Sequence, residues 1–397
     1  FKPLHSGKTG IAFDFFHQSP NDSLPSLLVD SVGLGTALLQ YSLYENRLYI
    51  QFPEALPKDT EQVLSVYYHG IPHRDSKWGG FIQEQGYIYT LGIGITSIPP
   101  NFGKVWYPCF DSFAERATYT YHVKSAGNYR AHCQGEFLGE QIVSGDTVIR
   151  SYSFNQPIPT HISAIAASNY ADLNFTHQGV YGPVDVRLTA KPGDTAGMRE
   201  RFVNIGKAID ACEFWYGPNP YSRVGYVTTT MGALEIPENI AYPTVMLSQP
   251  ASVNEGLYAH ELGHYWWGDW VAPYSHNDMW LKEGPAEYSS HLMTEFLYGR
   301  DAFIKEVKEN QYYVLTEAHV KDKGFWPLSP IPDSVVYGTH TYNKGAAVMH
   351  NLRAYMGDSL FRKSLRGIQQ SKALGTLSPE QFRDLLEAES GISLDYF

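Results

Sequence analysis

The chain has 397 residues, a mass of 44.7 kDa and a formal net charge of −11 at pH 7. This acidic balance argues against nucleic acid or an anionic membrane as the main partner, because both attract basic proteins. Hydrophobic residues make up 43% and charged residues 18%, with a mean hydropathy of −0.30, which is the composition of a globular protein rather than a disordered one.

The first part of the chain, residues 1–173, is predicted to form strands. Its short apolar runs are rich in Val, Ile, Tyr and Phe and are separated by Gly, Pro, Asn and Asp; they include SLLVDSV, NRLYIQF, QVLSVYYHG and YIYTLGIGI. This spacing is typical of a β-sandwich or a saddle-like sheet. At roughly 100 to 200 residues per domain, we expect residues 1–173 to be an N-terminal β-sheet domain.

The pattern changes after residue 173. Apolar residues recur at helical spacing from Met198 to Tyr216, and a strand-like RVGYVTTTMGALEI follows. From Leu257 onward most segments have helical periodicity, beginning with LYAHELGHYWWGDW. We therefore expect residues 174–397 to form a second domain that is mixed and mainly helical.

The cysteines, the glycosylation sequons and the apolar runs do not indicate in which compartment the protein works. Cys109, Cys133 and Cys212 share no C-x-x-C spacing and form an odd set, so neither a disulfide scaffold nor a zinc ribbon is expected. The glycosylation sequons at Asn21 and Asn174 are short enough to occur by chance. No apolar run approaches the ~18 residues of a membrane span. Compartment and oligomeric state are not determined by these features.

The segment HELGH at residues 260–264 is an H-E-x-x-H motif. Side chains four residues apart lie on one face of a helix, so His260 and His264 can direct two imidazole nitrogens at one metal ion. Eighteen residues separate His264 from Glu283, which lies in WLKEGPAEY at the start of another predicted helix. Glu283 is the expected third ligand, and the fourth position stays open to water, as a catalytic zinc requires.

Two other ligand sets are less well supported. A third His six residues after His264, as metzincins have, is absent because Trp270 stands there. His276 remains an alternative ligand, although SHND has the composition of an exposed loop.

HELGHYWWGDWV followed by WLKEGPAEY resembles the gluzincin family of aminopeptidase N and its leukotriene-hydrolase relatives. Four further segments match this family in order, and they are YPCFDSFAERATYTYHV, PIPTHISAIAASNY, MGALE and TYNKGAAVMHNLR. The resemblance covers most of residues 60–397. It implies a multidomain chain in which a β domain precedes a thermolysin-like α/β, mainly helical catalytic domain. It also implies one bound Zn²⁺, peptide substrates and zinc-dependent aminopeptidase activity.

The resemblance also assigns catalytic roles. Glu261 matches the general base that takes a proton from the zinc-activated water and passes it to the leaving amine. Tyr342, in YNKG, matches the tyrosine whose hydroxyl stabilises the developing oxyanion. Tyr337 is a weaker candidate for the same position.

The strand before the zinc helix is expected to bind the substrate. Glu235, in GALE, matches the glutamate that binds the free α-amino group, and Gly232 and Ala233 leave the backbone open to pair with the substrate as a strand. The segment departs from the family's G-x-M-E-N pattern, because Leu234 replaces the Met and Ile236 replaces the Asn.

These departures leave the amino anchor open. A shifted alignment would make Glu238 or Asn239 the anchor instead of Glu235. The family also contributes a Gln or Glu to the amino anchor from upstream of the segment that YPCFD matches. No Gln or Glu lies at that distance here, and Asn101 is the candidate in its place. Lys282 stands where the family usually has Asn, which places a cation beside a metal ligand's backbone, although helix geometry can point it to solvent.

The surroundings of the zinc motif are less clearly predicted. Asp278 and Glu287 are the carboxylates nearest in sequence that could orient the imidazoles, and solvation at the surface is equally expected for either. Trp266 and Trp267 are expected to pack in the core, because consecutive aromatic side chains on one helix cannot all face a cleft.

Three alternative functions remain. The altered strand is compatible with a metallo-endopeptidase or with a non-peptide hydrolase of the same fold, and a non-catalytic, zinc-bearing peptide-binding protein is the third alternative. The chain ends about where the family's catalytic domain ends. Without a further domain over the cleft, we expect an open site that accepts longer peptides.

Overall fold

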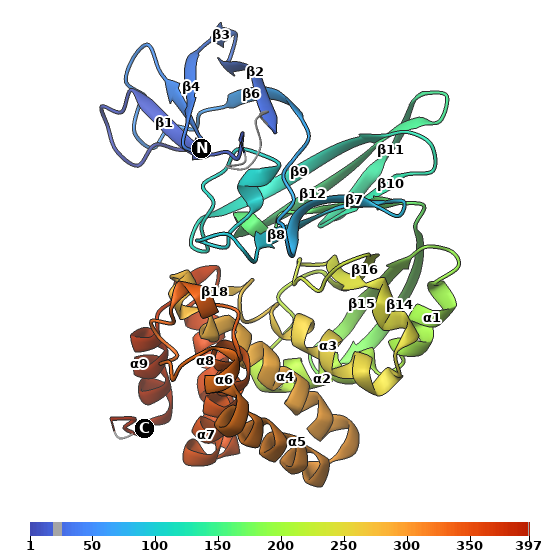
Figure 1. Ribbon diagram of the computed structural model, residues 1–397, viewed down its shortest axis with the longest axis vertical. Coiled ribbons are helices and arrows are strands. Elements are labelled where there is room, and N and C mark those ends of the chain that lie inside the picture. Colours follow the sequence, from blue (N-terminus) through green and yellow to red (C-terminus); the bar gives the residue numbers. More distant parts are fainter. Residues whose placement is uncertain (19–25, 396) are drawn as a thin grey trace.

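The computed structural model describes residues 1–18, 26–395 and 397. Strands predominate up to residue 190 and helices predominate after it (Figure 1). This confirms the prediction of a strand-rich region followed by a mainly helical one. The sequon at Asn21 lies outside the described residues. Among the described residues, no helix combines the length and the apolar character needed to cross a membrane.

Two three-stranded sheets form the beginning of the chain. Phe15, Leu27, Leu48 and Ile50 are almost completely buried in one hydrophobic core between them. Leu48 and Ile50 are two residues apart in one strand, so both point to the same face. The strand orders are β1-β5-β4 and β3-β2-β6, with β1 (Gly10–Asp14), β2 (Leu27–Leu34), β3 (Ala37–Leu38), β4 (Gln40–Tyr44), β5 (Arg47–Gln51) and β6 (Leu64–Gly70).

A four-stranded sheet and a three-stranded sheet follow. Tyr89 and Ile93 of β8 pack in one core with Leu234 and Met279, so the strand-rich region and the second half of the chain share buried surface. This packing holds the loop after β8 over the candidate functional site that is described below. The orders are β10-β13-β8-β7 and β11-β12-β9, with β7 (Gly79–Glu84), β8 (Tyr87–Gly94), β9 (Arg116–Ser125), β10 (Arg130–Cys133), β11 (Glu136–Ser144), β12 (Thr147–Pro159) and β13 (Ile165–Ser168).

The sheet β14-β15-β16-β17 leads into the helical part. Strands β14 and β15 form an antiparallel hairpin, and β16 and β17 add in parallel. The expected domain division between residues 173 and 174 falls inside β14 and stays a prediction. The bounds are β14 (Ala171–Gly179), β15 (Gly182–Ala190), β16 (Arg223–Thr229) and β17 (Ile240–Pro243).

Two predicted elements differ in extent. The helix expected from Met198 to Tyr216 is two helices, α1 (Thr195–Arg201) and α2 (Ile205–Tyr216). The strand expected to run through GALEI ends with β16. Beyond it, Leu234 still pairs with Ala241 through two backbone hydrogen bonds of 3.2 and 3.0 Å, which places the segment against the edge of β17.

The helices that follow pack around a second, larger core. Trp266 and Trp267 are buried in it, as predicted. The remaining elements are α3 (Ala251–Gly263), β18 (Val271–Pro273), α4 (Trp280–Tyr298), α5 (Arg300–Tyr313), α6 (His319–Lys321), α7 (Gly345–Met356), α8 (Asp358–Ser371), β19 (Gly375–Leu377) and α9 (Pro379–Ser390).

Helix α3 ends earlier than its periodicity predicts. It stops at Gly263, after which the Asp269 amide donates to the His264 carbonyl oxygen at 3.0 Å and turns the chain back. Gly263 also lets α4 approach closely, because a Cβ there would lie 2.5 Å from Ser289 Oγ. The end of α3 therefore lies directly against α4.

Candidate functional site

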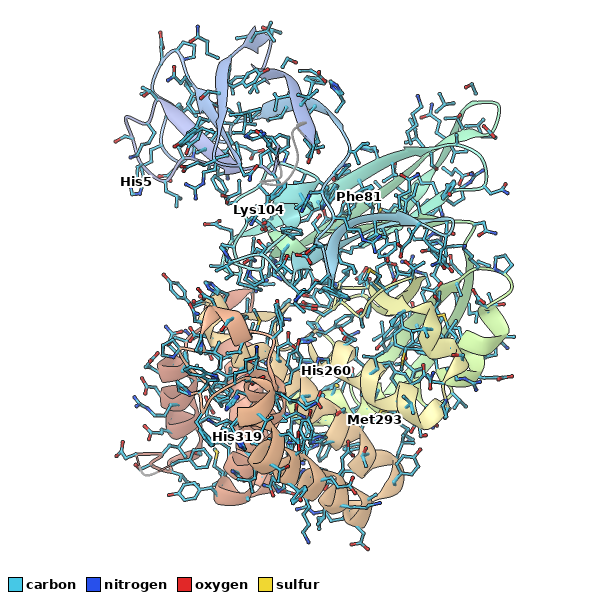
Figure 2. All side chains as sticks on the ribbon, in the orientation of Figure 1. His5, Phe81, Lys104, His260, Met293 and His319 are labelled. Carbon is cyan, nitrogen blue, oxygen red and sulfur yellow. The ribbon has the colours of Figure 1, made fainter. Side chains whose placement is uncertain are left out.

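The predicted metal ligands come from two neighbouring helices. His260 and His264 lie one turn apart at the end of α3, and Glu283 lies in the first turn of α4. The Nε2 atoms of the two imidazoles are 3.2 Å apart, and Glu283 Oε2 lies 3.4 Å from His260 Nε2 and 3.2 Å from His264 Nε2. Figure 2 shows His260 inside the molecule, where the helical half faces the strand-rich half.

The spacing of these three atoms fits a tetrahedral metal ion. Ligand atoms about 2.05 Å from zinc, at tetrahedral angles, lie about 3.3 Å from one another. The separations of 3.2 to 3.4 Å agree with this value. Two imidazole nitrogens and one carboxylate oxygen are also a donor set that suits zinc. The residues present therefore fit a zinc ion with one position open.

Hydrogen bonds on the far side of each ring orient the imidazoles. His264 Nδ1 donates to the Trp267 carbonyl oxygen at 2.8 Å, and His260 Nδ1 lies 3.0 Å from Glu287 Oε2. Protonation at Nδ1 leaves the Nε2 lone pair free for a metal. The structure thus brings one of the two expected carboxylates, Glu287, to an imidazole. The other, Asp278, instead accepts a 2.5 Å hydrogen bond from Ser329.

His276 is not near this cluster. Its Nε2 lies 2.9 Å from Asp333 Oδ1, in an exposed pair outside the ligand set. The Trp267 carbonyl that positions His264 was not anticipated, because a backbone acceptor leaves no mark in the sequence.

Glu261 lies beside the ligands and is almost completely buried. Burial raises the pKa of this carboxyl group to about 8, and the carboxylates of Glu235 and Glu283 contribute in the same direction, whereas His260 opposes them. A cation at the neighbouring ligands would lower this pKa, because it favours the charged form. The site can therefore hold Glu261 as a proton acceptor next to a metal.

Lys282 points inward rather than to solvent. Its ammonium lies 2.6 Å from Glu235 Oε1 and 2.7 Å from Glu283 Oε1, and the side chain is 2% exposed. Although burial alone raises the pKa of Glu235, the ammonium holds it below its usual range. Because Glu283 Oε1 is paired with Lys282, Oε2 is the oxygen directed at the imidazoles.

The structure distinguishes between the two alignments of the amino anchor. Glu235 lies in the same cavity as the metal ligands. Glu238 lies elsewhere, where it accepts hydrogen bonds from Ser222 and from the Gly135 amide, and Asn239 donates to the His132 carbonyl. Of these three residues, only Glu235 lines the cavity.

Two tyrosines, Tyr337 and Tyr342, line the same cavity as the predicted ligands. Tyr342 lies in a π-helical turn, His340–Lys344, and its ring stacks on the His260 ring at 5.8 Å between centroids. Burial raises the pKa of the Tyr342 hydroxyl, so it stays protonated and able to donate. The Tyr337 hydroxyl is also buried and has no hydrogen-bond partner among the described residues.

A cavity of about 840 Å³ opens over the cluster. The strand-rich region contributes Trp78, Ile93 and Ile95, whereas Asn101 is not among the described residues that line it. Trp78, which sequence reasoning missed, donates from its indole to the Gly232 carbonyl oxygen at 3.4 Å. The segment from Gly232 to Glu235, called the wall of the cavity below, lines it together with the three predicted ligands and both tyrosines.

The amino-acid sequence is similar to a peptidase family model and to known aminopeptidases. Residues 221–397 match the model of the peptidase family M1 domain. Aminopeptidase Q of Acinonyx jubatus is 24% identical over an alignment 371 positions long that covers 83% of this chain and 36% of that protein. Aminopeptidase M1 of Arabidopsis thaliana is 25% identical, over 94% of this chain and 44% of its own length. The chain thus spans less than half the length of these curated relatives.

The fold is also found in solved structures. The M1 zinc metallopeptidase from Deinococcus radiodurans has a TM-score of 0.82 and 20% sequence identity, over 97% of this chain and 84% of that one. A mutant of that metallopeptidase bound to a Tyr-Ser-Ala substrate also has a TM-score of 0.82, with 21% identity, over 98% and 84% of the two chains. At this identity the likeness establishes the fold.

Proposed function

We propose that the chain, whose residues 221–397 match the peptidase family M1 domain, is a member of that family and a zinc-dependent aminopeptidase acting on peptides. The observation that carries the proposal is the joint position of the predicted residues. His260, His264 and Glu283 are spaced for one tetrahedral ion, with Glu261 and Glu235 in the same cavity.

The proposed chemistry divides among the residues of the cavity. When bound by the three ligands, zinc supplies polarisation of the scissile carbonyl and acidification of a water molecule. Glu261 accepts the proton of the attacking water on its carboxylate and donates it to the leaving amine. Tyr342 donates its hydroxyl hydrogen to the carbonyl oxygen as negative charge develops there.

The wall from Gly232 to Glu235 is the proposed binding surface for the substrate. Gly232 and Ala233 present backbone without bulky side chains, so an extended peptide can pair with them as an added strand. Glu235, at the end of this wall, would bind the α-amino group and so position the first peptide bond at the metal.

We also propose a single zinc ion. A second set of groups, Glu235, Glu261 and His264, lies within 4.8 Å but shares His264 with the first set. Its Glu235 is already paired with Lys282, so it does not form an independent site. The proposed arrangement has a saddle-like sheet domain over residues 1–173 and a thermolysin-like catalytic domain over residues 174–397.

Hydrolysis of aminoacyl arylamides and of an unblocked decapeptide tests the function. We expect arylamide hydrolysis that a chelator abolishes and added zinc restores, and loss of residues from the decapeptide one at a time from its N-terminus. Internal fragments would instead indicate an endopeptidase. Peptide binding without hydrolysis, with zinc bound, would indicate a binding protein.

Replacing Tyr342 with phenylalanine should lower kcat by about 10²- to 10³-fold, because it removes one donor to the developing oxyanion. KM should change little, since the neutral ground-state carbonyl depends less on this donor. Steady-state kinetics on an arylamide substrate measure both constants. Tyr337→Phe is the matched control, and a larger loss of kcat in that variant would transfer the role to Tyr337.

A further inference from the structure

The hydroxyl of Tyr342 depends on the backbone that carries it. Tyr342 lies in the π-helical turn His340–Lys344, which leads directly into α7. Its ring packs against the rings of His260 and Tyr337, at 5.8 and 6.5 Å between centroids. Packed aromatic rings tolerate a range of offsets, so these contacts do not fix the hydroxyl by themselves. The position of the turn must also be fixed, and this depends on what binds its first amide groups.

Asp322, in the segment that follows α6, supplies acceptors for these amides. Its Oδ1 accepts the Thr339 amide at 3.0 Å, and its Oδ2 accepts the His340 amide at 2.8 Å. Thr339 occupies the N-cap position but leaves the capping of the turn to this side chain from outside it. A carboxylate is favoured at the start of a helical segment, because the amide groups there are directed at it. Asp322 therefore caps the turn that carries Tyr342.

The imidazole of His340 forms a second link between the two segments. His340 Nδ1 donates to Asp322 Oδ2 at 2.6 Å, and its Nε2 accepts from the Trp326 backbone amide at 3.3 Å. One ring nitrogen donates and the other accepts, which is the pattern of a neutral imidazole. The Trp326 carbonyl oxygen also accepts from Lys344 Nζ at 2.7 Å. Residues 322–326 thus contact both ends of the turn.

Gly338 leaves the space for this carboxylate. A Cβ at Gly338 would lie 2.7 Å from Asp322 Cγ and from both carboxylate oxygens. The side chains of Asp322 and His340 are 5% and 4% exposed, so water has little access to replace their contact. A buried carboxylate costs free energy unless donors surround it, and the donors to Asp322 all belong to the start of the turn. The positions of the carboxylate and of the turn are therefore coupled.

We propose that Asp322 is a positioning residue for Tyr342: its carboxylate fixes the turn His340–Lys344 so that the Tyr342 hydroxyl reaches the oxygen on which negative charge develops. This inference rests on the proposed function, which assigns the donor role to Tyr342. Asp322 is not among the described residues that line the cavity over the ligands, so it acts through the turn. Neither zinc binding nor proton transfer at Glu261 should depend on it.

A double-mutant cycle of Asp322→Ala and Tyr342→Phe tests this role, with an aminoacyl arylamide as substrate. We expect Asp322→Ala alone to lower kcat by about 10- to 100-fold, because a donor displaced by about 1 Å stabilises the developing charge poorly. KM should change by less than about threefold, and zinc should stay stoichiometric. In the Tyr342→Phe background no hydroxyl remains to be positioned, so Asp322→Ala should lower kcat further by less than about threefold.

Two results would overturn the inference. An equal loss of kcat in both backgrounds would show that Asp322 acts without the hydroxyl, and a kcat of Asp322→Ala within about threefold of the wild type would show that the hydroxyl does not need it.

A second variant covers the case in which Asp322→Ala does not fold. The far end of the turn is held by Asn310, whose amide exchanges two hydrogen bonds of 2.9 Å with Asn343. Asp322→Asn keeps the shape of the side chain but replaces one acceptor oxygen with an amide that has no lone pair for the turn. Its kcat should fall at least about fivefold, again only when Tyr342 is present. A smaller fall, or one independent of Tyr342, contradicts the inference.

An Asp–His pair in the strand-rich region provides the control. Asp172 lies 3.2 Å from the buried His132, and neither residue is among the described residues lining the cavity. Asp172→Ala should lower stability and keep kcat within about threefold in both backgrounds.

The same measurements separate this inference from the proposed function. If the wild type hydrolyses neither arylamides nor peptides, the proposed function fails. If the wild type is active and Tyr342→Phe keeps its kcat, zinc-dependent hydrolysis stands, but the donor role of Tyr342 and the positioning role of Asp322 both fail.

Discussion

Glu261→Gln is expected to lower kcat by about 10²- to 10⁴-fold and to leave the zinc content unchanged. Glutamine has nearly the same shape, but its amide cannot accept a proton from water. The three predicted ligands are untouched by this change, since Glu261 lies beside them without being part of their set. Single-turnover kinetics and metal analysis on the same preparation measure the two quantities.

A second buried glutamate on α3 provides the control. Glu255 accepts hydrogen bonds from Asn204 and Tyr298, both at 2.7 Å, and is not among the described residues lining the cavity. Glu255→Gln should affect stability without removing the chemical step. If Glu261→Gln retains wild-type turnover, Glu261 is not the general base.

His264→Ala is expected to remove zinc binding and to lower activity by more than about 10²-fold. Only two of the three ligands, His260 and Glu283, then remain, and a zinc site with two protein ligands is weak. Metal content by atomic absorption and arylamide hydrolysis measure the loss. Because His264 is buried, thermal unfolding with and without added zinc shows whether the variant is folded. Zinc should raise the Tm of the wild type but not that of His264→Ala.

The control for this change is the alternative ligand, His276. The His276–Asp333 pair is outside the cluster, so His276→Ala should keep stoichiometric zinc and near wild-type activity. If His276→Ala loses zinc and His264→Ala retains it, the metal ligand is His276 and not His264.

Features that depend on neighbours in the sequence were predictable. Residues four apart on a helix share a face, so HELGH alone placed His260 and His264 toward one point, and α3 presents them in this way. Apolar patterns likewise located strands β2, β5, β6, β8 and β16 and the helical segments that became α2 and α3. Glu283 was predicted from its place eighteen residues after His264, at the start of another predicted helix, and the family resemblance agreed. Its distance from the two imidazoles depends on how the two helices pack, which no local pattern specifies.

Ends of elements were less predictable than their cores. Periodicity continued α3 through the tryptophans, but the turn after Gly263 depends on a backbone hydrogen bond from Asp269 to His264. The tryptophans are buried in either arrangement, so the apolar pattern carries no information about where the helix stops.

Only the tertiary structure determined which charged side chains line the cavity beside the predicted ligands. The family match favoured Glu235 as the amino anchor, and a shifted alignment kept Glu238 as an alternative. Packing against β17 places Glu235, and not Glu238, in the cavity. The sequence also left Lys282 free to point either way. The space above Gly268 and the two facing carboxylates direct it inward, because burying an ammonium is tolerated only where opposite charges meet it. The sequence by itself thus determined which residue types are offered to a metal ion, whereas contacts between distant segments decided which charges surround these residues.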